Sequence, residues 1–225
     1  MATTEPDALR PPLQNRSRET LERVLDASEA LLVEKGWDGF TVQEVSRRSK
    51  VSIGSIYARA PSKEALLLAV YDRAVERIAA DNEAGLAPDE HWDSLSPREL
   101  IMGATRELAT QMLRHQQMLR VFMNRSPVDP VISQRGDDEV RRAASRYEEL
   151  LLRHKDQFTH PDPDLAIETA FRMVFSPMSR RISFGPDWGA YRNVDDEQLI
   201  EELGRGVAAY LLEAPAAPAR KKRGR

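Results

Sequence analysis

The stretch TVQEVSRRSKVSIGSIYARAPSKEAL, from Thr41 to Leu66, determines how the rest of the chain is interpreted. It predicts two short helices joined by a tight turn, which is the pattern of a helix-turn-helix. Thr41 and Glu44 have the spacing of a capping box, in which each side chain accepts a hydrogen bond from the other residue's backbone N–H. We therefore expect the first helix to begin at about residue 42, with Val42 and Val45 on its apolar face.

The second helix of the pair is predicted from Ile53 to about Arg59, with Ser52 as its N-cap. Ile53, Ile56 and Tyr57 recur at the i, i+3, i+4 spacing that anchors one face of a helix on a core. Small residues on the outward face would let this helix enter the major groove of DNA.

From about Thr20 to Leu68, about a quarter of its length, the chain resembles the TetR family of one-component transcriptional regulators. The DNA-binding segment of that family follows the approximate pattern T-V-x-x-I-A-x-x-A-G-V-S-x-G-T-L-Y-x-H-F-x-S-K-E-x-L. The residues that match it are Thr41, Val42, Val51, Ser52, Gly54, Tyr57, Ser62, Lys63, Glu64 and Leu66, with Val45, Ser55 and Ile56 as near equivalents. The resemblance implies an all-α protein, with an N-terminal three-helix helix-turn-helix DNA-binding domain followed by a helical ligand-binding and dimerisation domain.

Five positions depart from the family pattern, and two of these changes are sterically mild, since Ser46 and Ser49 replace alanines. Lys50 stands where the family has the turn glycine, so either this residue adopts a positive φ, at a cost of about 1 kcal/mol or more, or the turn differs. Arg59 and Ala60 replace a histidine and a phenylalanine, which removes an aromatic anchor behind the second helix. Arg59 adds a candidate phosphate contact.

Composition sets the broad class of the protein. At 225 residues the chain can form one large or two small domains with an ample core. The absence of cysteine excludes disulfides, thiolate metal sites and a cysteine nucleophile, and it is consistent with a reducing cytoplasm. No apolar run approaches about 18 residues and no signal pattern opens the chain, so we expect a cytoplasmic protein without a membrane segment.

The net charge of −3 is unevenly distributed along the chain. Between Thr41 and Lys63 there are five basic residues and one acidic residue, Glu44. The predicted helix-turn-helix is therefore locally positive, while most of the remaining chain is acidic and would be repelled by phosphate. This division favours one defined docking face over general adhesion to nucleic acid.

Four segments are predicted along the chain. Residues 1–16 form a flexible arm, 17–62 the helix-turn-helix domain, 63–213 a helical regulatory and dimerisation domain, and 214–225 a disordered basic tail. The first helix ends at Gly36, and a long helix capped by Ser62 runs to about Glu83. The tail either adds salt-sensitive affinity for DNA or serves only solubility.

The regulatory domain is predicted as a series of helices. Residues 84–95 form a loop, Ser96 and Glu99 cap the next helix, and further helices cover about 115–124, 131–155 and 162–177, where Pro177 kinks or ends the last of these. A final helix opens at Asp195. Small residues suit either a dimer interface, which the family resemblance implies for the last two helices, or packing within the chain; these are Gly204, Gly206, Ala208 and Ala209.

The predicted DNA contacts fall into two groups. Ser52, Ile53 and Ser55 are the candidates for base edges, and Gly54 lies between them. Candidates for phosphate contacts, which position the protein without specifying a sequence, are Thr41, Arg47, Lys50, Tyr57, Arg59 and Lys63. A domain this small reads too few base pairs alone, so the expected partner is a palindromic double-stranded operator bound by a homodimer.

A small apolar or amphipathic effector is expected to release the protein from DNA, which makes a repressor the favoured function. Release requires that the effector bind with different affinity to two conformations of the dimer, which differ in the spacing between the two DNA-binding domains. The side chains that would line an apolar pocket, or alternatively form plain core, are Met102, Met112, Met118, Phe122, Met123, Phe171, Phe175 and Met178.

Two other classes of function are alternatives to the regulator. An enzyme is not supported, because the four histidines are scattered, none has metal-ligand spacing, and neither a Gly-rich phosphate loop nor a G-x-S-x-G elbow occurs. We therefore predict no catalytic residue, no metal and no cofactor. The remaining alternative is a helical protein-interaction adaptor without sequence-specific DNA binding. Salt-sensitive affinity for duplex DNA distinguishes the adaptor from the regulator.

Overall fold

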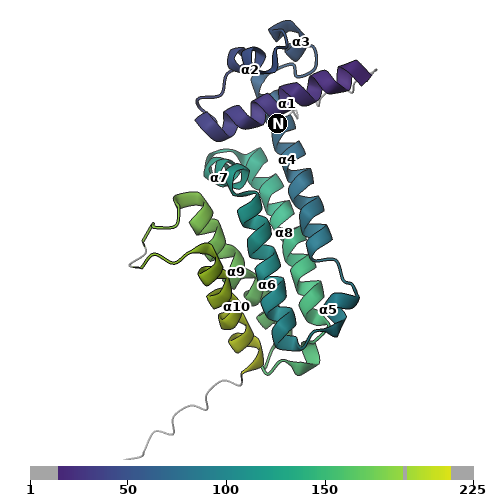
Figure 1. The fold of residues 1–225 in the computed structure, drawn as a ribbon, viewed down its shortest axis with the longest axis vertical. Coiled ribbons are helices and arrows are strands. Elements are labelled where there is room, and N and C mark those ends of the chain that lie inside the picture. The colour runs from purple at the N-terminus through teal and green to yellow at the C-terminus, as the bar shows by residue number, and fades with distance from the viewer. Residues whose placement is uncertain (1–14, 190–191, 214–225) are drawn as a thin grey trace, which may run out of the picture. The chain divides into compact units, whose positions relative to one another are not determined.

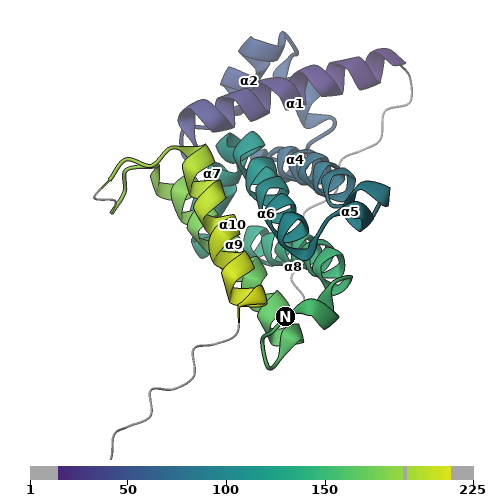
Figure 2. The same ribbon diagram turned by 60° about the horizontal axis from the view of Figure 1, so that its bottom comes forward.

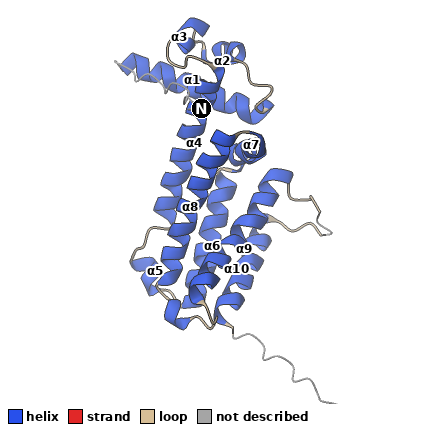
Figure 3. Ribbon diagram, turned by 180° about the vertical axis from the view of Figure 1, so that it is seen from behind, coloured by secondary structure: helices blue, strands red, loops and turns tan. Residues whose placement is uncertain are grey.

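The computed structural model describes residues 15–189 and 192–213, and all regular elements in these ranges are helices (Figures 1 and 3). In chain order they are α1 Asn15–Lys35, α2 Val42–Ser49, α3 Ile53–Tyr57, α4 Lys63–Gly85, α5 Glu90–Ser94, α6 Pro97–Arg114, α7 Gln116–Arg125, η1 Ser126–Val128, α8 Pro130–Leu152, η2 Lys155–Gln157, α9 Pro163–Phe184 and α10 Asp196–Leu212. The all-α prediction is confirmed. None of the helices in this part of the chain combines the length and apolar character needed to cross a bilayer.

Helix α1 begins at Asn15, two residues before the predicted start. The predicted arm over residues 1–16 falls outside the described residues as far as residue 14. The predicted basic tail over 214–225 lies wholly outside them.

The chain divides into two compact units. The first unit comprises Met1–Asp81 and Arg114–Val140, and the second comprises Asn82–Leu113 and Arg141–Arg225. The first unit therefore holds α1 to α3, most of α4, all of α7 and the first part of α8. The predicted DNA-binding segment 17–62 is part of this larger compact unit.

The first unit has one hydrophobic core that α1 to α4 share with α7 and α8. Phe40 and Ile56 are almost fully buried in it, and Met118 and Ile132 belong to the same cluster. The ring of Phe122 lies 4.6 Å from that of Tyr71, centroid to centroid, so α7 packs on α4 through an aromatic pair. Burial of these side chains supplies the main stabilisation of the unit.

The second unit is built on α6, α9 and α10, with α9 and α10 packed side by side (Figure 2). Tyr147, on the second part of α8, is fully buried, and its hydroxyl lies 3.2 Å from that of Thr105 on α6. Burial raises the pKa of Tyr147 to about 12. A Cβ on Gly204 would lie 2.9 Å from the sulfur of Met102, so this glycine permits close packing of α10 on α6. Gly206, by contrast, faces open space.

Most predicted helix boundaries are confirmed by cap geometry. Ser62 caps α4 through the N–H of Ala65, and Asp195 caps α10 through that of Gln198. Gly36 ends α1 with φ at 66°, as a left-handed C-cap glycine does. The complete capping box occurs at α6, where Ser96 and Glu99 each accept from the other's backbone N–H.

Two boundary predictions are wrong. The segment 84–95 is not entirely loop, because Asp89 caps the short helix α5 and Trp92 is buried. Of the two effects predicted for Pro177, an end of the helix is contradicted, because α9 continues to Phe184. A proline inside a helix removes one backbone hydrogen bond, and here the buried Val174, Met178 and Ile182 on either side keep the helix packed.

Candidate nucleic-acid interface

The N-terminus of α2 contains only half of the predicted capping box. The Thr41 hydroxyl accepts a hydrogen bond from the N–H of Glu44 at 3.3 Å, as expected. The Glu44 carboxylate does not complete the box and instead accepts from Arg47 at 2.6 and 2.9 Å and from Arg48 at 2.9 Å. These bonds from Arg47 and Arg48 lower the pKa of Glu44 to about 2. The carboxylate therefore holds two cations of α2 together.

The two arginines differ in how firmly they are held. Arg48 also pairs with Glu34 on α1 at 2.7 Å, and 23% of its side chain is exposed. Among the residues that the structure describes, Arg47 pairs with Glu44 of its own helix, and 71% of its side chain is exposed. Arg47 is therefore placed to exchange its carboxylate partner for a phosphate, whereas Arg48 links α2 to α1.

In the turn between α2 and α3, Lys50 takes the first of the two alternatives left open by the sequence, a positive φ, with φ at 56° and ψ at 34°. The hydroxyl of Ser46 donates to the carbonyl of Val51 at 2.7 Å and so supports the turn. Lys50 itself is exposed. A lysine held in a left-handed turn carries a cation on the outer side of the helix-turn-helix.

Helix α3 is short and largely exposed. Ser52 is its N-cap, as predicted, and accepts from the N–H of Ser55 at 3.2 Å, while the two serine hydroxyls lie 2.8 Å apart. The prediction that Ile53 and Tyr57 help anchor the helix is wrong, since they are 38% and 43% exposed. Of the three, Ile56 alone is buried, with 1% exposed, and Ala60 beyond the helix is buried in the same core. The predicted base-edge candidates are therefore all accessible.

Arg59 and Lys63 lie beyond α3 and are less free than the prediction assumed. Arg59 donates to the hydroxyl of Ser17 on α1 at 2.5 Å and is partly buried. The ammonium of Lys63, in the first turn of α4, lies 5.9 Å from the centroid of the Phe40 ring. It also borders a pocket of about 260 Å³ in the first unit, whose other lining residues are Trp37, Asp38, Glu64, Leu67, Arg125 and Asp129. Lys63 can reach a phosphate at the helix N-terminus, whereas Arg59 is engaged in positioning α1 against the end of α3.

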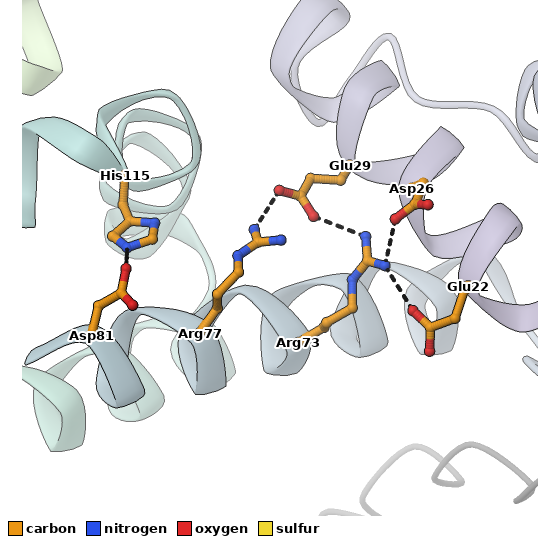
Figure 4. A network of polar contacts seen from close by, with 7 residues as sticks. All are labelled: Glu22, Asp26, Glu29, Arg73, Arg77, Asp81 and His115. Atoms are coloured by element: carbon orange, nitrogen blue, oxygen red, sulfur yellow. Dashed lines mark hydrogen bonds and ion pairs between the residues drawn. The ribbon is translucent and has the colours of Figure 1, made fainter. Parts of the chain in front are cut away.

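A network of charges between α1 and α4 was not predicted (Figure 4). Arg73 on α4 donates to Glu22, Asp26 and Glu29 of α1 at 3.2, 2.7 and 2.9 Å, and Arg77 donates to Glu29 at 2.5 Å. We refer to these five residues as the α1–α4 seam. The sequence spacing does indicate one charged face on each helix, because the three carboxylates recur at i, i+4 and i+7 and the two arginines at i, i+4.

The candidate effector-binding residues are distributed over both units. Met118, Phe122 and Met123 lie in the first unit, and the first two belong to its buried core. The other five lie in the second unit, namely Met102, Met112, Phe171, Phe175 and Met178. There the rings of Phe171 and Phe175 stack at 5.4 Å. Within the described ranges, no group of three or more His, Cys, Asp or Glu side chains suits a metal ion.

Comparison with known proteins adds three findings. Residues 24–70 match the family model described as bacterial regulatory proteins, tetR family. The chain is 32% identical over 112 residues to the HTH-type transcriptional repressor KstR of Rhodococcus jostii, and 30% identical over 107 residues to KstR of Mycolicibacterium smegmatis. These matches cover 48% and 47% of this chain, and they span only about half of each relative, 50% and 52%.

Solved structures with low sequence identity share the fold. A TetR transcription regulator from Haloarcula marismortui has a TM-score of 0.65 at 15% identity, covering 86% of this chain and 97% of that one. A transcriptional regulator from Rhodococcus sp. Rha1 has a TM-score of 0.63 at 17% identity, covering 88% and 99%. At this level of identity the likeness concerns the fold alone.

Proposed function

We propose that the chain belongs to the TetR family of bacterial regulatory proteins, that it binds double-stranded DNA through α2 and α3, and that it represses transcription. The family consists of transcription regulators, which are not enzymes, in agreement with the interpretation of the sequence. The repressor assignment is supported by the names of the two curated relatives. Such a protein acts where the chromosome lies, in the cytoplasm.

The observation that carries the proposal is the exposure of α3. A five-residue helix that buries one side chain contributes little to a core, yet a capped N-terminus and a strained turn at Lys50 hold it in place. Strain and capping at an exposed element are explained if the element meets a ligand. The local excess of positive charge makes that ligand a polyanion.

Contacts to DNA divide by chemistry. Ser52, Ile53 and Ser55 face the base edges, with Gly54 between them. Phosphates are held by a second set, which consists of Thr41, Arg47, Lys50, Tyr57 and Lys63, with Arg59 acting mainly through its bond to Ser17.

Specificity requires two copies of the chain. One exposed helix of five residues reaches too few base pairs for a useful specificity ratio, so we propose a homodimer on a palindromic operator. The exposed Gly206 on α10, with open space at its Cα, supports a close approach of a second copy at this helix. Gly204 is already occupied by packing against Met102 within the chain.

Effector control is the remaining part of the proposal. A small apolar or amphipathic molecule could bind among the five candidate effector-binding residues of the second unit. It would release DNA if it favours a dimer conformation in which the spacing of the two DNA-binding domains does not match the operator. The stacked Phe171 and Phe175, with Met178 on the same helix, supply an aromatic and polarisable surface for such a molecule.

Selection of bound fragments from a random duplex library tests the proposal. We expect a palindrome with half-sites about one helical turn apart, bound with an affinity that falls steeply with added salt. Enrichment of a single non-repeated motif would contradict the dimeric arrangement. Absence of binding to any duplex at low salt would overturn the function and favour the adaptor.

A further inference from the structure

The outermost strip of α3 has almost no side chain. Each residue of a helix is rotated by about 100° from the one before, so Gly54 and Ala58 lie roughly 160° around the helix from the buried Ile56. A Cβ added at Gly54 would meet nothing within 4 Å, so this glycine is not required by packing inside the protein. Any surface that α3 faces can therefore approach its backbone closely.

The two flanks of this strip differ in chemistry. On one flank Ile53 and Tyr57, four residues apart, form an exposed apolar edge. On the other flank Ser52 and Ser55 present hydroxyl groups that are hydrogen-bonded to each other. The helix therefore offers one edge that can donate and accept hydrogen bonds and one edge that cannot.

We propose that Ile53 selects a thymine in each half-site by contact with the 5-methyl group of the base. This inference rests on the proposed function and specifies what one residue of the interface reads. In the major groove, thymine is the base whose edge carries an apolar group, and the other bases present hydrogen-bonding atoms. Those atoms would lose water against an isoleucine without gaining a partner.

Neighbouring residues support a DNA base as the occupant of this edge. Arg47 has 71% of its side chain exposed and Lys50 is exposed in the turn, so cations accompany the apolar edge on the same helix-turn-helix. This combination suits a polyanion whose groove contains methyl groups. The ring of Tyr57 extends the apolar edge by one turn, and its hydroxyl remains assigned to a phosphate.

Deoxyuridine tests the inference, because it differs from thymidine only by the methyl group. Using the full chain and the selected duplex, each thymine is replaced in turn by deoxyuridine and the dissociation constant is measured. We expect a loss of about three- to fivefold at one position of a half-site, and roughly tenfold or more when both half-sites are changed, as expected for one buried methyl group per contact. The Ile53→Ala variant should bind the thymine and deoxyuridine duplexes equally.

Controls separate failure of this inference from failure of the proposed function. Leu165→Ala removes an exposed side chain of similar size on α9 and should retain the discrimination. Tight binding with no loss at any deoxyuridine, a selected site without thymine, or discrimination that survives in Ile53→Ala would each refute the role of Ile53 while leaving the DNA-binding function intact. A chain that binds no duplex would overturn both.

Discussion

The recognition surface and the α1–α4 seam lie in the same compact unit but use polar groups in opposite ways. The recognition surface comprises Lys50, Ser52, Ile53, Gly54, Ser55, Tyr57 and Ala58. Its side chains are exposed, and its hydroxyl contact joins two residues of the same turn, Ser52 and Ser55. In the seam, Arg73 and Arg77 of α4 are paired with carboxylates of α1.

The difference shows that a count of basic residues overstates the charge available for binding. Of the five basic residues between Thr41 and Lys63, Arg48 is held by Glu34 and Glu44, and Arg59 donates to Ser17. Charges used between helices fix geometry, and charges left at the surface can meet a phosphate. Substitutions in the two regions should accordingly separate affinity from stability.

The largest effect is expected from Ser55→Glu in the recognition surface. A carboxylate there would face the groove and be repelled by phosphate, so operator affinity should fall by about 100-fold or more, measured by fluorescence anisotropy. Folding should be unaffected, because glutamate is favourable in the first turn of a helix. Ser55→Gln, which has the size of glutamate without its charge, is the matched control. Operator binding retained by Ser55→Glu would show that α3 does not enter the groove.

Arg73→Met in the seam should lower the stability of the fold, where Ser55→Glu lowers operator affinity. Removing the guanidinium leaves Glu22, Asp26 and Glu29 close together without their shared cation, and should destabilise the protein by roughly 1–2 kcal/mol, seen as a lower Tm. Arg172→Met, which breaks an exposed pair with Glu168, should cost less than about 0.5 kcal/mol. An equal Tm for the two variants would mean that the seam contributes no more than a surface ion pair.

The same two regions mark what could be predicted from the sequence. Within the recognition surface, Ser52 as N-cap follows from residue types within a few positions of each other, and it is confirmed. The positive φ of Lys50 was one of two alternatives that the sequence left open, and the structure shows which of them occurs. The prediction that the Glu44 carboxylate accepts from the backbone N–H of Thr41 is wrong, because arginines at i+3 and i+4 compete with that N–H. At Ser96 and Glu99 the residues at i+3 and i+4 from the glutamate are Met102 and Gly103, which offer no cation, and the box closes.

Contacts between distant segments could not be predicted in this way. The apolar spacing of Ile53, Ile56 and Tyr57 fits an anchored face, but only Ile56 of the three is buried, because burial depends on which distant segments pack against the helix. The pairing of α1 with α4 depends on residues more than 40 positions apart. The grouping of Met118 and Phe122 with the first unit likewise depends on how α7 packs, which local periodicity does not encode.

Gly54→Ala should raise the stability of the fold and lower the affinity for the operator. The added methyl meets nothing within the protein and improves helix propensity, so the free energy of unfolding should rise by up to about 1 kcal/mol. It should also hold the α3 backbone away from DNA and weaken operator binding by about tenfold. Gly136→Ala on α8, with its nearest atom 3.8 Å away, offers the same helix gain without the loss of affinity. Unchanged operator affinity in Gly54→Ala would exclude a close approach at this strip.

Lys63→Ala should have a smaller and sequence-independent effect. Loss of one phosphate contact weakens binding to all duplexes alike and lowers the slope of log affinity against log salt by about one. Lys155→Ala removes the same charge in the second unit, where the ammonium pairs with Asp164, and should leave the slope unchanged. A slope in Lys63→Ala that equals the wild-type slope would restrict Lys63 to its contact with Phe40.

The smallest effect is expected from Glu44→Gln, which changes a residue that belongs to neither region but restrains a cation beside the recognition surface. Neutralising the carboxylate loosens Arg47, so affinity for non-specific duplexes should rise a few-fold at low salt. Glu99→Gln, at the other capping box, should leave DNA affinity unchanged.

Because the pKa of Glu44 is lowered to about 2 in the folded protein, its charge stabilises the fold above the ordinary pKa near 4.5, and this contribution is lost as the pH falls towards 2. Acid unfolding of Glu44→Gln should therefore depend less steeply on pH in that window, whereas identical acid profiles would show that the bonds to Arg47 and Arg48 do not persist in solution.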